Sequence, residues 1–355
     1  MTAKRPTIDD VAAHSGVGRT TVSRVLNGGP NVRDEVRRRV LESVEALDYR
    51  VTPQARSLAG GRGGVLALIL ASDLEAEPNS FYASALELGA LRGCLDLGFQ
   101  LLTRHVPQQS AGRKREIVDL LEQQRCQGAI LTPPFADDVE MIQDIRARGC
   151  QVATISPGGP GLKVADGVGI DDEGGGYDIA RHLIALGHRR FAFISGIKGH
   201  LSAEHRLDGL KRALLEHGLD PASVLTLQGD FTFRSGGVLA ARLLDDPHPP
   251  TALICANDDM AAGALSVAHG RGLEVPGQLS ITGFDDTPVS SIVWPPLTTV
   301  HQPLKDMGGE AVRLIAERLA GTRRTADWRF TTLPHAVVAR ASAGRVEARL
   351  ATVSA

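Results

Sequence analysis

The sequence predicts an α/β protein with a small helical head in front of a large body of parallel sheets flanked by helices. Residues 7–47 hold three short helical patterns, whereas from residue 64 onward short apolar runs alternate with amphipathic segments, as in parallel sheets covered by helices. Residues 1–62 contain eleven Lys/Arg and seven Asp/Glu, a net charge of +4, and the remainder carries −6. A basic head on an acidic body indicates a polyanionic partner for the head; a merely solvated helical face is the alternative.

The head is predicted to fold as three helices. Thr7 and Asp10 have capping-box spacing, and Gly16 suits the left-handed position that ends a first helix. A second helix follows from about Arg19, and a third runs from Asp34 to Leu47. The apolar positions expected to face the core are Ile8, Val11, Ala12, Val22, Val25, Leu26, Val36, Val40, Val44 and Leu47.

Two short helices joined by a tight glycine-containing turn, followed by a third, predict a helix-turn-helix module. In such modules the N-terminal residues of the second helix reach base edges in the major groove. Once the apolar residues face the core, Arg19, Thr20, Ser23 and Arg24 must face outward. Short hydroxyls and guanidinium groups suit phosphates and guanine edges. Three packed helices with a purely structural role remain the alternative on this pattern alone.

The stretch "TIDDVAAHSGVGRTTVSRVLNG" resembles the N-terminal signature of the lac and galactose repressor family of bacterial transcription regulators. The resemblance continues through "LDYRVTPQARSLAGGR" and across nearly the whole chain. It implies a repressor that binds a palindromic, double-stranded operator as a homodimer. The residues that it places at the DNA are Thr7, Gly18, Arg19, Thr20, Thr21, Ser23, Arg24, Asn27, Tyr49, Ala55, Arg56 and Leu58.

Two positions depart from the family pattern. Gly18 stands where family members often have a serine as the cap of the recognition helix, and glycine caps acceptably but brings no hydroxyl. After Tyr49 the usual Pro-Asn is replaced by Val51-Thr52, with Pro53 one place later. Pro53 can still serve as the first residue of a short helix.

The resemblance also implies a domain order: a headpiece at 1–50, a hinge at 51–62, a two-lobed core at 63–342 and a short tail at 343–355. The hinge would form a helix only on the operator, with Leu58 as an apolar wedge in the minor groove. A flexible linker is the alternative for this segment, because so short a helix is unstable alone in water.

The body is expected to contain two similar lobes. From the residues alone we expect one chain crossing between them near residue 163, whereas the resemblance implies a core like that of periplasmic sugar-binding proteins, with more than one crossing. The expected strands are 65–72, 99–105, 128–134, 189–196, 223–230, 251–258 and 279–286. The expected helices are 82–97, 112–125, 173–186, 203–217, 233–245 and 258–272.

Polar residues follow several expected strands, where ligands bind in open α/β sheets. The resemblance places the effector at Asp73, Phe81, Ser156, Arg206, Phe231, Asn257 and Asp285, with Phe81 facing the ligand more directly than Tyr82. Asn257 and Asp285 could instead cap the following helix or turn. Carboxylates beside flat apolar rings favour a carbohydrate effector, and a purine is the alternative.

The sequence lacks the motifs that are typical of other function classes. There is no GxGxxG motif after a strand, no Walker A loop, no GxSxG elbow and no HExxH motif, so we expect no enzyme, cofactor or metal site. The N-terminus shows no apolar signal segment, and no apolar run is long enough to span a membrane. We therefore expect a cytoplasmic protein and not a periplasmic binding protein. The four cysteines are widely spaced, as expected of reduced thiols. Val346, Leu350 and Val353 supply about one heptad, so we expect a dimer and no coiled-coil tetramer.

Overall fold

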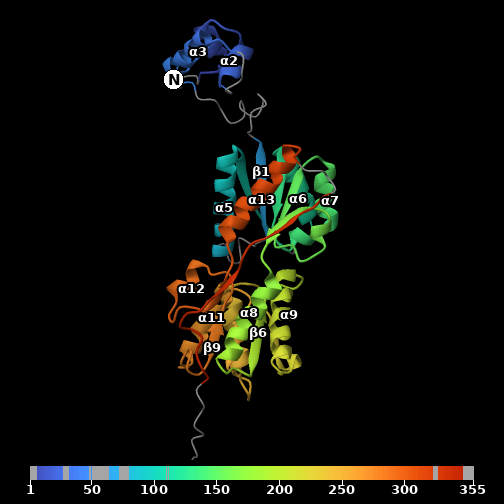
Figure 1. Cartoon of the computed structure of the whole chain (residues 1–355), viewed down its shortest axis with the longest axis vertical. Helices are drawn as coiled ribbons and strands as arrows, with labels where there is room; N and C mark the ends of the chain where they lie inside the picture. Colours follow the sequence, from blue (N-terminus) through green and yellow to red (C-terminus); the bar gives the residue numbers. More distant parts are fainter. Residues whose placement is uncertain are drawn as a thin grey trace, which may run out of the picture. The chain divides into compact units, whose positions relative to one another are not determined.

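The computed structural model describes residues 6–26, 32–47, 49, 64–71, 80–108, 110, 112–322 and 327–346. Two compact units are present, an N-terminal head and a body (Figure 1). The expected hinge at 51–62, and with it Ala55, Arg56 and Leu58, lies outside the described residues, as do Asn27 and Asp73.

The head consists of α1 (Ile8–Ser15), α2 (Arg19–Leu26) and α3 (Asp34–Ala46). The predicted capping box is confirmed: the Thr7 side chain accepts from the Asp10 amide, and the Asp10 carboxylate accepts from the Thr7 amide at 2.7 Å. Gly16 ends α1 with φ of 65°, the left-handed conformation that glycine tolerates. The predicted apolar positions, except Val36, meet in one small core that includes the fully buried Val11 and Val22.

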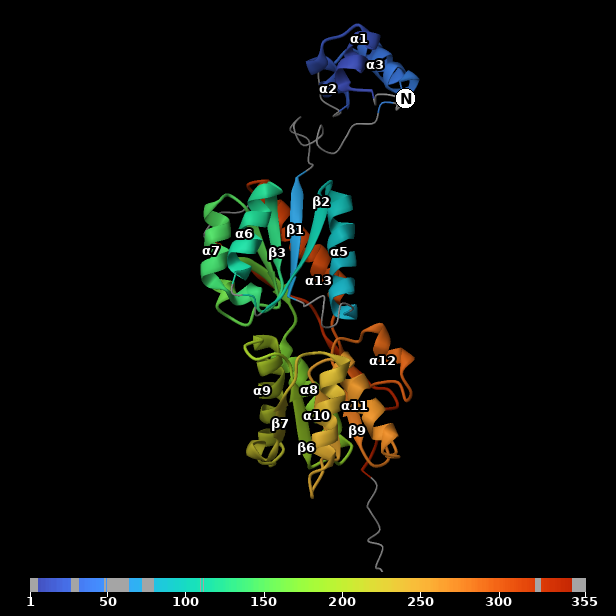
Figure 2. The ribbon, with the colours of Figure 1, turned by 180° about the vertical axis from the view of Figure 1, so that it is seen from behind.

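The first lobe of the body is a six-stranded sheet in the order β11-β5-β4-β3-β1-β2. Its strands are β1 (Val65–Ala71), β2 (Gln100–Val106), β3 (Cys126–Leu131), β4 (Gln151–Ile155), β5 (Asp166–Gly169) and β11 (Phe330–Thr332). Its helices are α5 (Phe81–Leu97), α6 (Arg113–Gln123), α7 (Val139–Ala147) and α13 (Leu304–Leu319), with short 3-10 turns η1 (Phe135–Asp137) and η2 (Gly161–Lys163). Figures 1 and 2 show α13 and α6 on opposite faces of this sheet.

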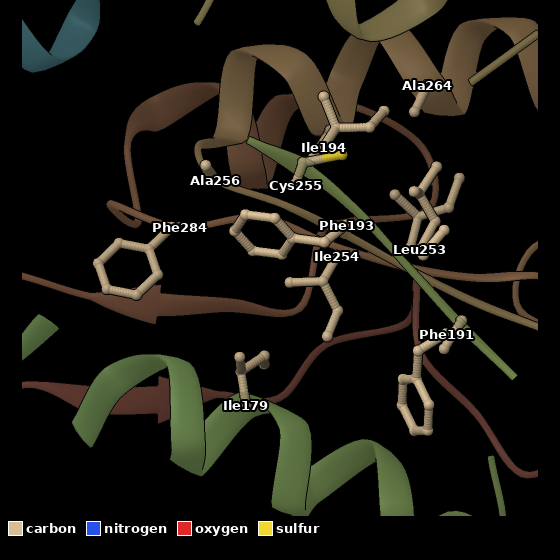
Figure 3. Packing of buried hydrophobic residues seen from close by; sticks show 14 of the residues in the cluster. Ile179, Phe191, Phe193, Ile194, Leu253, Ile254, Cys255, Ala256, Ala264 and Phe284 are labelled. Atoms are coloured by element: carbon tan, nitrogen blue, oxygen red, sulfur yellow. The ribbon is translucent and has the colours of Figure 1, made fainter. Parts of the chain in front are cut away.

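The second lobe is a four-stranded parallel sheet in the order β7-β6-β8-β9. Its strands are β6 (Phe191–Ser195), β7 (Leu225–Gln228), β8 (Ala252–Cys255) and β9 (Ser280–Thr282). Its helices are α8 (Asp172–Ala185), α9 (Leu201–Glu216), α10 (Phe233–Leu244), α11 (Asp258–Gly270) and α12 (Pro288–Ile292), with the 3-10 turn η3 (Pro221–Ser223). Figure 3 shows its apolar core, in which Phe193 and Phe284 lie at the end that carries Ala256.

The chain passes between the lobes three times. It leaves the first sheet after β5, returns as α13 against β3, β4 and β5, and leaves again after β11, which pairs with β5. It ends in β12 (Ala336–Val338), antiparallel to β10 (Thr299–His301). The expectation of a single crossing near residue 163 is therefore wrong, and the several crossings implied by the resemblance are confirmed. Strand and helix patterns alternate in the same way whichever sheet the next strand joins, so the local pattern carries no crossing signal.

Candidate DNA-binding surface and ligand site

The second helix of the head presents its polar row to solvent. Arg19, whose side chain is 67% exposed, lies beside exposed Thr20 and Arg24, while Val22 and Val25 are buried on the opposite side. Thr21 and Ser23 are half-buried at the edges of the row. The nearest carboxylate to Arg19 is Asp9 at 3.7 Å, an exposed ion pair too weak to hold the guanidinium against a competing phosphate.

Three further predicted DNA contacts have evident roles in the fold of the head. Thr7 caps α1. Gly18 directly precedes α2, and its carbonyl accepts from the amides of Thr21 at 2.8 Å and Val22 at 3.1 Å. Tyr49 is buried in the core of the head, so packing accounts for most of its ring. None of these roles prevents a contact with DNA, which stays a prediction.

Arg206, near the start of α9, lies at the centre of a buried polar cluster in the body. Its Nε donates to Asp172 Oδ1 at 2.9 Å, its Nη2 lies 2.8 Å from the same oxygen, and its Nη1 donates to the Ala256 carbonyl at 2.6 Å. The guanidinium also stacks on Phe284, with 3.6 Å between its central carbon and the ring centroid. Arg206 is only 5% exposed, which makes it a fixed part of the wall of the site.

Asp285, which follows β9, brings a second carboxylate to the same guanidinium. Its Oδ1 is 3.9 Å from Arg206 Nη1 and accepts from Gln302 Nε2 at 2.5 Å. Burial raises the pKa of Asp285 well above its usual range, against the opposing effect of the Arg206 charge. Burial likewise raises the pKa of Asp172. Both carboxylates are therefore held where negative charge is already poorly solvated.

Asn257 has the structural role that the sequence left open. Its Oδ1 accepts from the Met260 amide at 3.0 Å as the N-cap of α11, and its Nδ2 donates to the Phe231 carbonyl at 2.9 Å. Both ends of the amide are thus used within the protein, and Asn257 fixes the backbone that carries Phe231.

Several of the expected effector residues have a strained backbone with positive φ. Ser156, Phe231 and Asp285 have φ of 43°, 70° and 108°, and Asp286 follows with 55°. Among the described non-glycine residues, the one other positive φ belongs to Arg125. Such conformations are costly, and they are retained where a side chain has to be aimed at a functional site.

Aromatic rings line the cluster. The Phe231 ring covers the backbone at Gly196, where a Cβ would come within 1.9 Å of it, and meets the His200 ring edge-to-face with centroids 4.7 Å apart. From α5, the hydroxyl of Tyr82 lies beside Ser156, and burial and Asp285 raise the pKa of this phenol. Phe81, expected to be the ligand-facing member of the pair, is 43% exposed.

A pocket of about 390 Å³ adjoins the cluster through Ser156 and Asp172, and is also lined by Asp171, Glu173 and His205. Its volume falls within the range of small-molecule sites. The Ser156 hydroxyl and Gln302 Oε1 are buried and have no hydrogen-bond partner of ordinary geometry among the described residues. Of these two residues Ser156 lines the pocket, and an unsatisfied buried oxygen there is a place for a ligand to bond.

Sequence reasoning missed Asp172, Gln302, His200 and Phe284 and gave Tyr82 a minor role. Nothing in their local sequence marks them, except that Asp172 and Phe284 each adjoin a strand end. Within the described ranges no group of three or more His, Cys, Asp or Glu side chains is arranged to hold a metal ion, and no helix there has the length and apolarity needed to cross a bilayer.

Comparisons with known proteins agree with this geometry. Residues 7–51 match the model for bacterial regulatory proteins of the lacI family, and residues 180–343 match a periplasmic binding protein-like domain. The transcriptional regulator DegA of Bacillus subtilis (strain 168) is 35% identical over 325 residues, which cover 90% of this chain and 93% of DegA. The chain belongs to the lacI family.

Solved structures of family members match over nearly the full length. A lac repressor dimer bound to operator and the anti-inducer ONPF superposes with a TM-score of 0.81 at 26% identity, covering 96% of this chain and all of that one. The complex of the regulator CelR with cellobiose has a TM-score of 0.70 at 30% identity, covering 95% of this chain and all of that one. This lacI-family chain is thus a DNA-binding transcription regulator with an effector-binding body.

Proposed function

We propose that this lacI-family regulator binds a palindromic operator as a dimer through α2 and is released when a carbohydrate binds beside Arg206. The observation that carries the DNA part is the exposed row on α2, formed because Val22 and Val25 are buried on the other side. In a helix-turn-helix this row enters the major groove. The two-fold symmetry of an operator requires two heads, and hence a dimer.

The effector part is supported by the buried cluster around Arg206 and the adjoining pocket. The residues proposed to bind the ligand are Asp73, Phe81, Ser156, Arg206, Phe231, Asn257 and Asp285, now with Tyr82. Asn257 would contribute the second N–H of Nδ2 or the second lone pair of Oδ1, because each of these atoms already makes one hydrogen bond within the protein. A carbohydrate is favoured over a purine as the effector, because the relative CelR was solved in complex with cellobiose.

Ligand binding shifts a conformational equilibrium only if the ligand prefers one state. The proposed preference is for a closed arrangement of the lobes that separates the two hinge segments of the dimer and so weakens operator binding. We further propose that the regulator works in the cytoplasm, where operator DNA lies, and that it has no enzymatic activity.

The test is gel retardation of a palindromic duplex by the purified chain, followed by titration with sugars and purines. Retardation of the palindrome in excess of a scrambled duplex, reversed by at least one sugar, is the expected result. Equal retardation of both duplexes would contradict the operator proposal. Release by purines but by none of the sugars would overturn the carbohydrate assignment and leave the regulator assignment intact.

A further inference from the structure

The charges around Arg206 are balanced before any ligand arrives. At least three of the five guanidinium N–H groups are engaged, two directed at Asp172 and one at the Ala256 carbonyl. Asp172 is itself buried, so the pair forms a neutral, desolvated unit. The N–H groups left over can bond a ligand oxygen, but the positive charge has its counterion already.

The same cluster contains two buried carboxyl groups for its one arginine. Asp285 is a second buried carboxyl, 3.9 Å from Arg206 Nη1. The adjoining pocket adds Asp171, which accepts from the Gly174 amide at 2.8 Å, and Glu173, which pairs with Arg212 at 2.5 Å. An anionic ligand would enter a site in which one carboxyl already resists ionisation.

Among the described residues that line the pocket there is neither a lysine nor an arginine. Burial and the neighbouring Arg206 lower the pKa of His200 to about 3, so its imidazole is neutral near pH 7. His205 lines the pocket together with Asp171, Asp172 and Glu173.

The unpartnered atoms call for a ligand that donates hydrogen bonds. Gln302 turns its Nε2 to Asp285, which leaves its buried Oε1 an acceptor without a donor. The Ser156 hydroxyl, which lies beside the Tyr82 hydroxyl, can both donate and accept. The hydroxyls of a sugar satisfy such groups without adding charge.

Resting on the carbohydrate effector proposed above, we infer that the Arg206 site takes an uncharged polyhydroxylated ligand and rejects sugar acids and sugar phosphates. The distinction between these two groups of ligands rests on their charge. A carboxylate or phosphate would have to be buried without a free counterion, a cost that neutral hydroxyls avoid.

The test is calorimetric titration of the full chain at pH 7.5 with matched sugars: glucose, glucose 6-phosphate and glucuronate; galactose and galacturonate; cellobiose and cellobionate. At least one neutral member should bind, and its charged counterpart should bind at least about tenfold more weakly. A charged member that binds more tightly than its neutral counterpart, or a panel in which no neutral sugar binds, overturns the inference. Operator retardation measured on the same preparation separates this result from failure of the regulator assignment.

A pair of variants tests the stated cause. Asp172→Asn removes the counterion of Arg206, and should reduce the preference for the neutral sugar over its charged counterpart by about tenfold or more. Asp208→Asn removes an exposed charge of α9 that lies outside the pocket lining, and should change the preference by less than about threefold. Equal changes in the two variants would overturn the charge-balance argument, and thermal melting checks that both are folded.

Discussion

The Asp172 carboxylate holds Arg206 through a single oxygen, Oδ1, which lies 2.9 Å from Nε and 2.8 Å from Nη2. The contact joins the N-terminal ends of two helices, because Asp172 is the first residue of α8 and Arg206 lies near the start of α9. The backbone of Arg206 is equally constrained, since a Cβ added at Gly176 of α8 would come within 2.1 Å of its carbonyl oxygen. The ion pair and the close packing of the two helices together fix the guanidinium of Arg206 beside Asp285.

Arg206→Ala should therefore abolish the ligand response while operator binding persists. Removing the arginine leaves the buried Asp172 without its counterion, which typically costs about 3–5 kcal/mol, so the melting temperature should also fall. The double variant Arg206→Ala/Asp172→Asn should recover much of that stability but not the response. The measurement is release of pre-bound operator by the active sugar, and release of the single variant at the wild-type sugar concentration would place the effector elsewhere.

Arg19→Ala should reduce affinity for the preferred operator by about 1–3 kcal/mol and relax selectivity at one base pair per half-site, because an arginine at the start of the recognition helix suits a guanine edge. Arg24→Ala is the matched comparison from the same exposed row. If Arg24 holds a phosphate, its loss should weaken all sequences alike. The check is quantitative retardation on the operator and on a set of single-base variants; uniform weakening by Arg19→Ala would rule out base reading by this residue.

Gly18→Ser should stabilise the head and tighten operator binding. A Cβ at this position would meet no atom closer than Thr20 Oγ1 at 3.9 Å, so the serine fits without rearrangement. Its hydroxyl can cap α2, which is worth a few tenths of a kcal/mol relative to glycine, and can reach a phosphate. Gly18→Ala is the control because it adds the Cβ without the hydroxyl and should destabilise. Weaker operator binding by the serine variant would show that glycine is needed here.

The head could be predicted almost residue by residue, because its determinants are local. The cap at Thr7, the left-handed Gly16 and the stripe of Val22 and Val25 each follow from a spacing of three or four residues, and all were confirmed. The alternation of strands and helices in the body was predicted within 65–134 and 173–286, whereas α7, β4, β5 and α13 were not predicted. The alternation of patterns could not show that α13 and β11 return to the first sheet, because that depends on which of the two sheets has an unpaired edge strand.

The ligand site was predicted only in part, for the same reason. Arg206 and Asp285 were predicted from the family pattern, and they do lie together. Asp172 and Gln302, which neutralise and orient them, are 34 and 17 residues away along the chain from the atoms they bond. Such partners become neighbours only through tertiary packing, so no spacing in the sequence marks them.

Asp258 is a buried carboxyl whose titration should be measurable in the stability of the body. Its Oδ1 accepts from Thr299 Oγ1 at 2.6 Å, and its Oδ2 accepts from the amide and hydroxyl of Thr287 at 2.8 and 3.1 Å. Burial nevertheless outweighs these hydrogen bonds and raises the pKa of Asp258 from 3.8 to about 7. The folded state therefore holds a proton that the unfolded state has lost between about pH 4 and pH 7.

Because the folded-state pKa of this acid is raised, its contribution to stability is complete below about pH 4 and is lost as the pH rises to about 7. Asp258→Asn removes the titration, so the unfolding free energy of the variant minus that of wild type should rise across this interval by up to about 4 kcal/mol. Buried His188 and His200 are present in both proteins and cancel in the difference, whereas Asp285, whose pKa is raised in part by Asp258, contributes to it. Urea unfolding at pH 4.5, 6 and 7.5 measures it, with exposed Asp208→Asn as the control. A difference that is constant with pH, as expected for the control, would mean that Asp258 is ionised throughout.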